Sequence, residues 1–214
     1  MVLLEWKYLV FLEEREGYPP IFLWDEMSSN PEYYMGIIKL ICGKEDDFSG
    51  LKEEKTRIVS QCYKLLYGWK RVPGMRMNGM LDTTVLNNWI AVVTAESKKY
   101  DVESMAFNYF GRAAFYAPID EDGFFIDKHV ANVLQEDKEG HALSGYFTEA
   151  INSRGLHSVD ITGQAEFELE KGYQEKANAA DAAGMFRLAE TLRNIASAYH
   201  DEGEHNIKYG HDLE

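Results

Sequence analysis

Apolar residues recur at every third or fourth position along almost the whole chain, which is the spacing of one face of an α-helix. Proline and glycine interrupt this spacing and divide the chain into separate segments. The pattern predicts an all-α protein, a multi-helix bundle of about nine to ten helices in antiparallel pairs. The expected helices cover about residues 3–12, 21–27, 31–41, 51–69, 83–93, 102–116, 128–134, 141–154, 164–180 and 184–199.

Several of these helices have a recognisable first residue. Asn30 stands before Pro31, and Asp82 and Asp127 stand before the helices near 83–93 and 128–134. Asparagine and aspartate side chains accept hydrogen bonds from the free N–H groups of a first helical turn, and proline suits the first helical position. These residues are therefore predicted N-caps.

One stretch breaks the helical pattern more strongly than the others. Residues 71–81 contain Pro73-Gly74 and Asn78-Gly79, both of which are turn signals. We expect a loop or linker there, between an N-terminal helical subdomain (1–70) and a C-terminal acidic helical subdomain (82–214).

Charge is distributed unevenly along a chain whose net charge is −14. Residues 1–100 hold 14 acids and 13 bases, whereas the remaining residues hold 22 acids and 9 bases. Such an acidic surface repels phosphate backbones, so nucleic acid is not an expected partner. One basic stretch runs from Lys52 to Arg76, and we interpret it as a solvated helix face or as a contact for the chain's own acidic half. Nucleic-acid binding through this stretch is a third hypothesis for function.

The apolar N-terminal segment is interrupted by Glu5 and Lys7 and is too short to span a membrane. It also lacks the cleavage site of a signal peptide. Cys42 and Cys62 are not spaced as a metal site, and one pair makes no disulfide framework. We expect a cytoplasmic protein with reduced thiols and no membrane partner.

Signatures of common chemistry are absent from the sequence. It has no phosphate-binding glycine loop and no nucleophile elbow. Asp120-Glu121-Asp122-Gly123 resembles part of a calcium loop, but His129 stands where a bidentate glutamate is needed. The sequence predicts no cofactor, no metal and no catalytic residue, and it favours a non-enzymatic role.

Two arginines in the acidic half are candidate binding residues. Arg112 lies in an aromatic helix, and Arg154 ends the helix over 141–154. Together with Asp120 and Asp122 they form the predicted binding site, because paired guanidinium groups can clamp an anion or a partner's carboxylate. The alternative is an internal salt bridge to Glu149 or Asp122.

The helix around Arg112 has aromatic side chains on more than one face. Such a helix is either central in the core or forms part of a sticky surface. The aromatic residues are Phe107, Tyr109, Phe110, Phe115 and Tyr116.

Short motifs along most of the chain carry a resemblance to a known kind of protein. They are Leu4-Glu5-Trp6-x-Tyr8-Leu9, Asn30-Pro31-Glu32-Tyr33-Tyr34, Trp69-x-x-Val72-Pro73-Gly74, Ala117-Pro118-x-Asp120-x-Asp122-Gly123, and Asn152-Ser153-Arg154-Gly155. In this order they resemble an uncharacterised helical domain near the C-terminus of long bacterial proteins. Residues 191–204 also resemble the first helix of a tetratricopeptide repeat.

Taken together, these patterns predict a protein–protein interaction or scaffold module. The resemblance implies that it belongs to a larger bacterial protein, so its partners would be another protein or flanking domains of a longer chain. The alternative is a small-ligand binder or enzyme, with a site between helices near Arg112, Asp120, Asp122 and Arg154.

Overall fold

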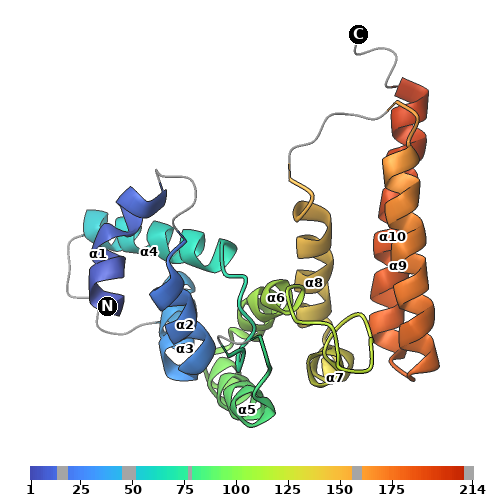
Figure 1. The fold of residues 1–214 in the computed structure, drawn as a ribbon. Coiled ribbons are helices and arrows are strands. Elements are labelled where there is room, and N and C mark those ends of the chain that lie inside the picture. The colour runs from blue at the N-terminus through green and yellow to red at the C-terminus, as the bar shows by residue number, and fades with distance from the viewer. Residues whose placement is uncertain (14–18, 45–51, 77–78, 156–160, 210–214) are drawn as a thin grey trace. The chain divides into compact units, whose positions relative to one another are not determined.

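The computed structural model describes residues 1–13, 19–44, 52–76, 79–155 and 161–209. These residues form ten α-helices and no strand, which confirms the predicted all-α bundle (Figure 1). The helices are α1 (Val2–Glu13), α2 (Ile21–Ser29), α3 (Pro31–Ile41), α4 (Lys52–Tyr67), α5 (Thr83–Tyr100), α6 (Glu103–Ala114), α7 (Lys128–Glu136), α8 (His141–Asn152), α9 (Gln164–Ala182) and α10 (Phe186–Tyr209).

The chain forms two compact units, Met1–Pro118 and Ile119–Glu214. This division comes later in the chain than the predicted linker over residues 71–81. Part of that segment is fastened to α2, because Ser28 donates a hydrogen bond to the Arg71 carbonyl at 2.9 Å. The helices that follow it, α5 and α6, pack against α2 and α3. They therefore complete the first unit rather than begin the second.

The core of the first unit is an aromatic cluster drawn from four helices or their ends. Tyr34, Trp69, Trp89 and Phe110 are all almost completely buried, and neighbouring ring centroids lie 4.8–6.0 Å apart. Their polar atoms are satisfied: Trp89 Nε1 donates to the Met27 carbonyl at 2.9 Å. Aromatic pairs at this distance add stability beyond the area that they bury. The cluster joins α3 and α4 to α5 and α6.

The predicted N-caps are confirmed. The Asn30 side chain accepts a hydrogen bond from the Tyr33 N–H at 3.1 Å, and Pro31 is the first residue of α3. Asp82 and Asp127 accept from the first turns of α5 and α7. Local side-chain chemistry thus sets where these helices begin.

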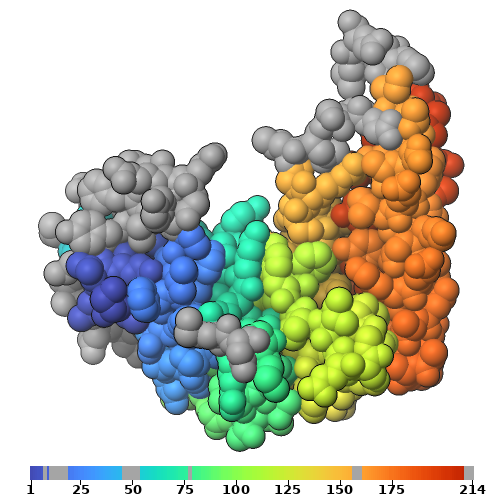
Figure 2. Space-filling view, viewed as in Figure 1, coloured from blue at the N-terminus to red at the C-terminus, as the bar shows by residue number. Residues whose placement is uncertain are grey.

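The second unit is built around two long antiparallel helices, α9 and α10 (Figure 1). Leu188, Leu192, Ile195 and Tyr199 of α10 are buried in this unit. In Figure 2 the orange atoms of α9 cover most of the red α10. The shorter helices α7 and α8 pack on α10.

Helix α10 continues past the predicted end at Tyr199 to Tyr209. The extension packs on the start of α9, where Gly203 lies beside the side chains of Glu166 and Phe167. Gly203 and Asn206 are buried residues of this extension, so the polar sequence after Tyr199 has an inner face and remains helical.

Candidate functional site

A hollow with aromatic walls lies on the first unit, between α4 and α6. Its volume is about 560 Å³, and it is lined by Tyr63, Lys64, Tyr67, Gly68 and Tyr109. Tyr63 is 41% exposed and Tyr67 is 59% exposed. We refer to these five residues together with Arg112 as the α4–α6 surface.

The helical period of α4 explains why two tyrosines point outwards. Cys62, Leu65 and Leu66 lie on the inner face and are almost fully buried. Tyr63 and Tyr67 are four residues apart, so they lie one above the other on the outer face. The fold therefore leaves two large aromatic side chains exposed at the surface, where they do not contribute to the core.

Arg112 of α6 packs against two of the three tyrosines of this surface. Its guanidinium carbon lies 4.4 Å from the centre of the Tyr67 ring and 5.7 Å from that of Tyr109. Arg112 is only 7% exposed, so these cation–π contacts are largely shielded from water. Burial raises the pKa of Tyr109, while the charge of Arg112 opposes that rise. The rings of Tyr67 and Tyr109 are thereby pre-positioned.

The surroundings of the surface are basic. Residues 55–71 contain five basic residues and no acidic one. Arg57, Lys64 and Lys70 are exposed, and the Lys70 ammonium lies 5.0 Å from the centre of the Tyr116 ring. Arg71 is paired with Asp25 at 2.7 Å. An acidic protein thus presents a local cationic and aromatic region.

The predicted site residues Asp120 and Asp122 form a turn before α7. Asp120 accepts a hydrogen bond from the Lys128 N–H at 2.9 Å, and Asp122 forms an ion pair with the Lys128 ammonium. This pairing lowers the pKa of Asp122, whose carboxylate is stabilised by the nearby cation. The contacts of both aspartates order the turn.

Arg154 lies just after α8 and is held by two glutamates. Its Nη2 atom is 2.5 Å from Glu166 Oε1, and its Nη1 atom is 3.5 Å from Glu202 Oε1. Glu166 is fully buried, at 0% exposure. The sequence suggested Glu149 or Asp122 as partners, whereas the structure pairs Arg154 with helices α9 and α10.

The four predicted residues thus belong to different local structures. Arg112 is part of the first unit, and Asp120, Asp122 and Arg154 are part of the second. Sequence reasoning missed Tyr63 and Tyr67. The signal was present in the spacing, which puts both on the face of α4 opposite its leucines.

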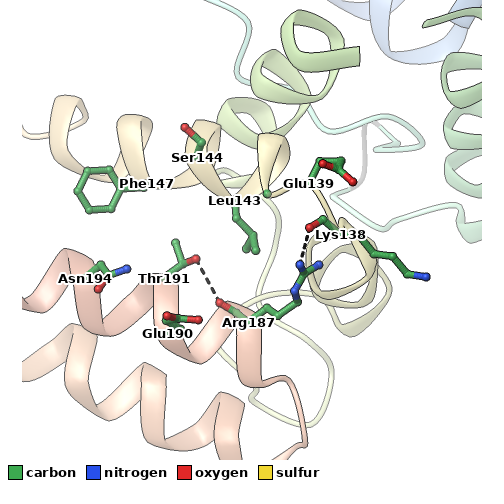
Figure 3. A pocket seen from close by; sticks show the side chains of 10 residues that line it. Lys138, Glu139, Leu143, Ser144, Phe147, Arg187, Glu190, Thr191 and Asn194 are labelled. Atoms are coloured by element: carbon green, nitrogen blue, oxygen red, sulfur yellow. Dashed lines mark hydrogen bonds between the residues drawn. The ribbon is translucent and has the colours of Figure 1, made fainter. Parts of the chain in front are cut away.

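A second hollow, of about 520 Å³, lies between α8 and α10 (Figure 3). Leu143 and Phe147 of α8 lie on one side, and Thr191 and Asn194 of α10 lie on the other. At one end the Arg187 guanidinium binds the backbone carbonyls of Asp137 and Lys138. Arg187 therefore ties the α7–α8 turn to α10.

Within the described ranges, no helix is long and apolar enough to cross a membrane. The same residues contain no group of three or more histidine, cysteine, aspartate or glutamate side chains that could hold a metal ion.

No protein-family model, no curated protein and no solved structure matches this chain.

Proposed function

We propose that this chain is a protein-binding module whose partner docks on the α4–α6 surface. The observation that carries this proposal is the pair of exposed tyrosines, Tyr63 and Tyr67, of which Tyr67 packs on the buried guanidinium of Arg112. Tyrosine and arginine are enriched at protein interfaces and contribute much of the binding energy there.

Pre-positioning of the rings supports the same proposal. A side chain that becomes fixed on binding loses conformational freedom, and this loss weakens association. Tyr67 and Tyr109 already contact Arg112 before any partner arrives. Their rings can therefore be buried with little further ordering.

The alternative, a small-ligand or catalytic site formed by Arg112, Asp120, Asp122 and Arg154, has weaker support. Arg154 contacts Glu166 and Glu202, and Asp122 contacts Lys128. A ligand at these residues would compete with existing ion pairs, whereas a partner at the α4–α6 surface would not have to displace them.

The motif resemblance extends this proposal to the protein's setting. If the chain belongs to a larger bacterial protein, the partner is either a separate protein or a flanking domain. A separate protein and a flanking domain would bury the same tyrosines, so one experiment tests whether this surface binds either of them.

The test uses the full chain with a photo-crosslinking amino acid in place of Tyr63. We expect this chain to crosslink a defined protein, which is then purified and titrated against the wild type and a Tyr63→Ala/Tyr67→Ala variant. Loss of two interface tyrosines should weaken binding by about tenfold or more.

Tyr209→Ala is the matched control, because Tyr209 is similarly exposed, at 44%, but lies at the end of α10. It should bind as the wild type does. Equal affinities for the wild type and the double variant would overturn the proposal. Circular dichroism of each variant checks that the helices are retained.

A further inference from the structure

The charges around the α4–α6 surface indicate what kind of partner it accepts. Arg57 and Lys64 are both exposed on α4 and are separated by two helical turns, or about 10 Å along the axis. Lys70 lies just beyond the helix and is also exposed. Lys64 lines the same hollow as the tyrosine pair. All three cations lie on a stretch that has no acidic residue from position 55 to position 71.

We infer that the partner presents an acidic segment in which aspartate or glutamate alternates with apolar side chains. This inference rests on the proposed function and names the chemistry of its partner. The apolar side chains would pack on Tyr63 and Tyr67, and the carboxylates would lie near Arg57, Lys64 and Lys70. Complementary charge of this kind speeds association and selects among partners.

The observations favour an acidic peptide over a nucleic acid. The whole chain carries a net charge of −14, which repels a dense row of phosphates more strongly than a peptide with a few carboxylates. The Arg112 guanidinium is buried against Tyr67 and Tyr109, so it contributes to ring placement rather than to phosphate contacts. An acidic peptide has fewer charges and supplies apolar groups for the rings.

The test measures fluorescence anisotropy of three labelled probes with the full chain. The first is a peptide in which glutamate and aspartate alternate with leucine and phenylalanine. The second is an uncharged control peptide of the same length, with glutamine and asparagine at the acidic positions. The third is single-stranded oligothymidine. We expect the acidic peptide to bind most tightly and to lose affinity as salt is added.

Two charge variants test whether the cations near the α4–α6 surface contribute to binding of the acidic peptide. Arg57→Gln/Lys64→Gln should weaken binding of the acidic peptide about threefold to tenfold, the effect of losing two exposed charge pairs. Lys98→Gln/Lys99→Gln removes the same charge from the end of α5 and should leave binding unchanged.

The outcomes separate this inference from the proposed function. If both peptides bind equally and both are lost in Tyr63→Ala/Tyr67→Ala, the surface binds protein but the inference is overturned. Tighter binding of oligothymidine also overturns it. If the tyrosine variant binds both peptides as the wild type does, the proposed function fails as well.

Discussion

Glu166 is a carboxylate with no exposure to water, and the Arg154 guanidinium lies 2.5 Å away. Removing a carboxylate from water costs several kcal/mol, which only a close cation and hydrogen bonds can offset. Arg154 therefore contributes to stability mainly by making the burial of Glu166 tolerable. Its position after α8 ties that helix to α9.

Replacing Arg154 with methionine keeps much of the side-chain volume but leaves Glu166 without its cation. We expect Arg154→Met to lower the free energy of unfolding by about 2–4 kcal/mol. Urea unfolding followed by circular dichroism measures this change. Arg193→Met is the control, since its pair with Asp181 is partly exposed to water and its loss should cost less than about 1 kcal/mol. Equal costs for the two variants would contradict the prediction.

His200 of α10 gives stability a dependence on pH. Its Nδ1 atom lies 3.0 Å from Glu170 of α9, and this hydrogen bond raises the pKa of His200 above 6.5. A raised pKa means that the folded state holds the proton more tightly than the unfolded state does. The resulting stability is full below pH 6.5 and is lost as pH rises through the higher folded value.

Thermal unfolding between about pH 5.5 and 8 tests this dependence. The melting temperature of the wild type should exceed that of Glu170→Gln by a margin that shrinks as pH rises. His200→Asn should show the same shrinking margin, because it removes the other half of the pair. A constant margin across this range would show that the pair does not titrate as described.

At the scale of helices, α9 and α10 approach each other closely where Gly163 meets Gly203. Gly163 has a positive φ of 65°, and a Cβ atom there would lie 2.8 Å from the Gly203 carbonyl oxygen. No side chain fits at that distance from backbone. The extension of α10 beyond Tyr199 meets the start of α9 at this contact.

Two alanine substitutions on the same pair of helices should have opposite effects. Gly163→Ala should destabilise the protein by about 1–3 kcal/mol, through both the positive φ and the backbone clash. Gly172 lies inside α9 with open space around it, so Gly172→Ala should stabilise the protein by about 0.5–1 kcal/mol. Chemical denaturation of both variants shows whether each substitution raises or lowers the free energy of unfolding. A stabilising Gly163→Ala would mean that the two helices do not meet as described.

The elements could be predicted because the signals for them are local. Apolar spacing and caps such as Asn30 and Asp82 lie within a few residues of the helices that they specify. The α4–α6 surface could not be predicted in the same way. Whether Tyr67 is buried or exposed depends on which helices cover α4, and its contact with Arg112 joins two helices far apart in the sequence. Arg112 was a predicted candidate, but its aromatic partners were not.

At the scale of the whole molecule, the position of the division follows from long-range packing. Pro73-Gly74 and Asn78-Gly79 are strong turn signals, and they suggested a boundary at 71–81. The core of the first unit nevertheless needs Trp89 and Phe110, which come after that turn. A turn in the chain is a local feature, whereas a domain boundary depends on which side chains share a core.

Fragments test this division. Residues 1–118 should unfold cooperatively in urea, because they contain the complete aromatic cluster. Residues 1–81 should not, because they lack Trp89 and Phe110. Circular dichroism and the steepness of the transition distinguish the two. A cooperative transition in the shorter fragment would support the earlier boundary instead.

All four tryptophans of the chain, Trp6, Trp24, Trp69 and Trp89, belong to the first unit. The indole emission of the intact protein is therefore a spectroscopic label for that unit alone, while far-ultraviolet dichroism reports on the helices of both. Any gap between the two denaturation curves measures how independently the units melt, without cutting the chain or attaching a dye.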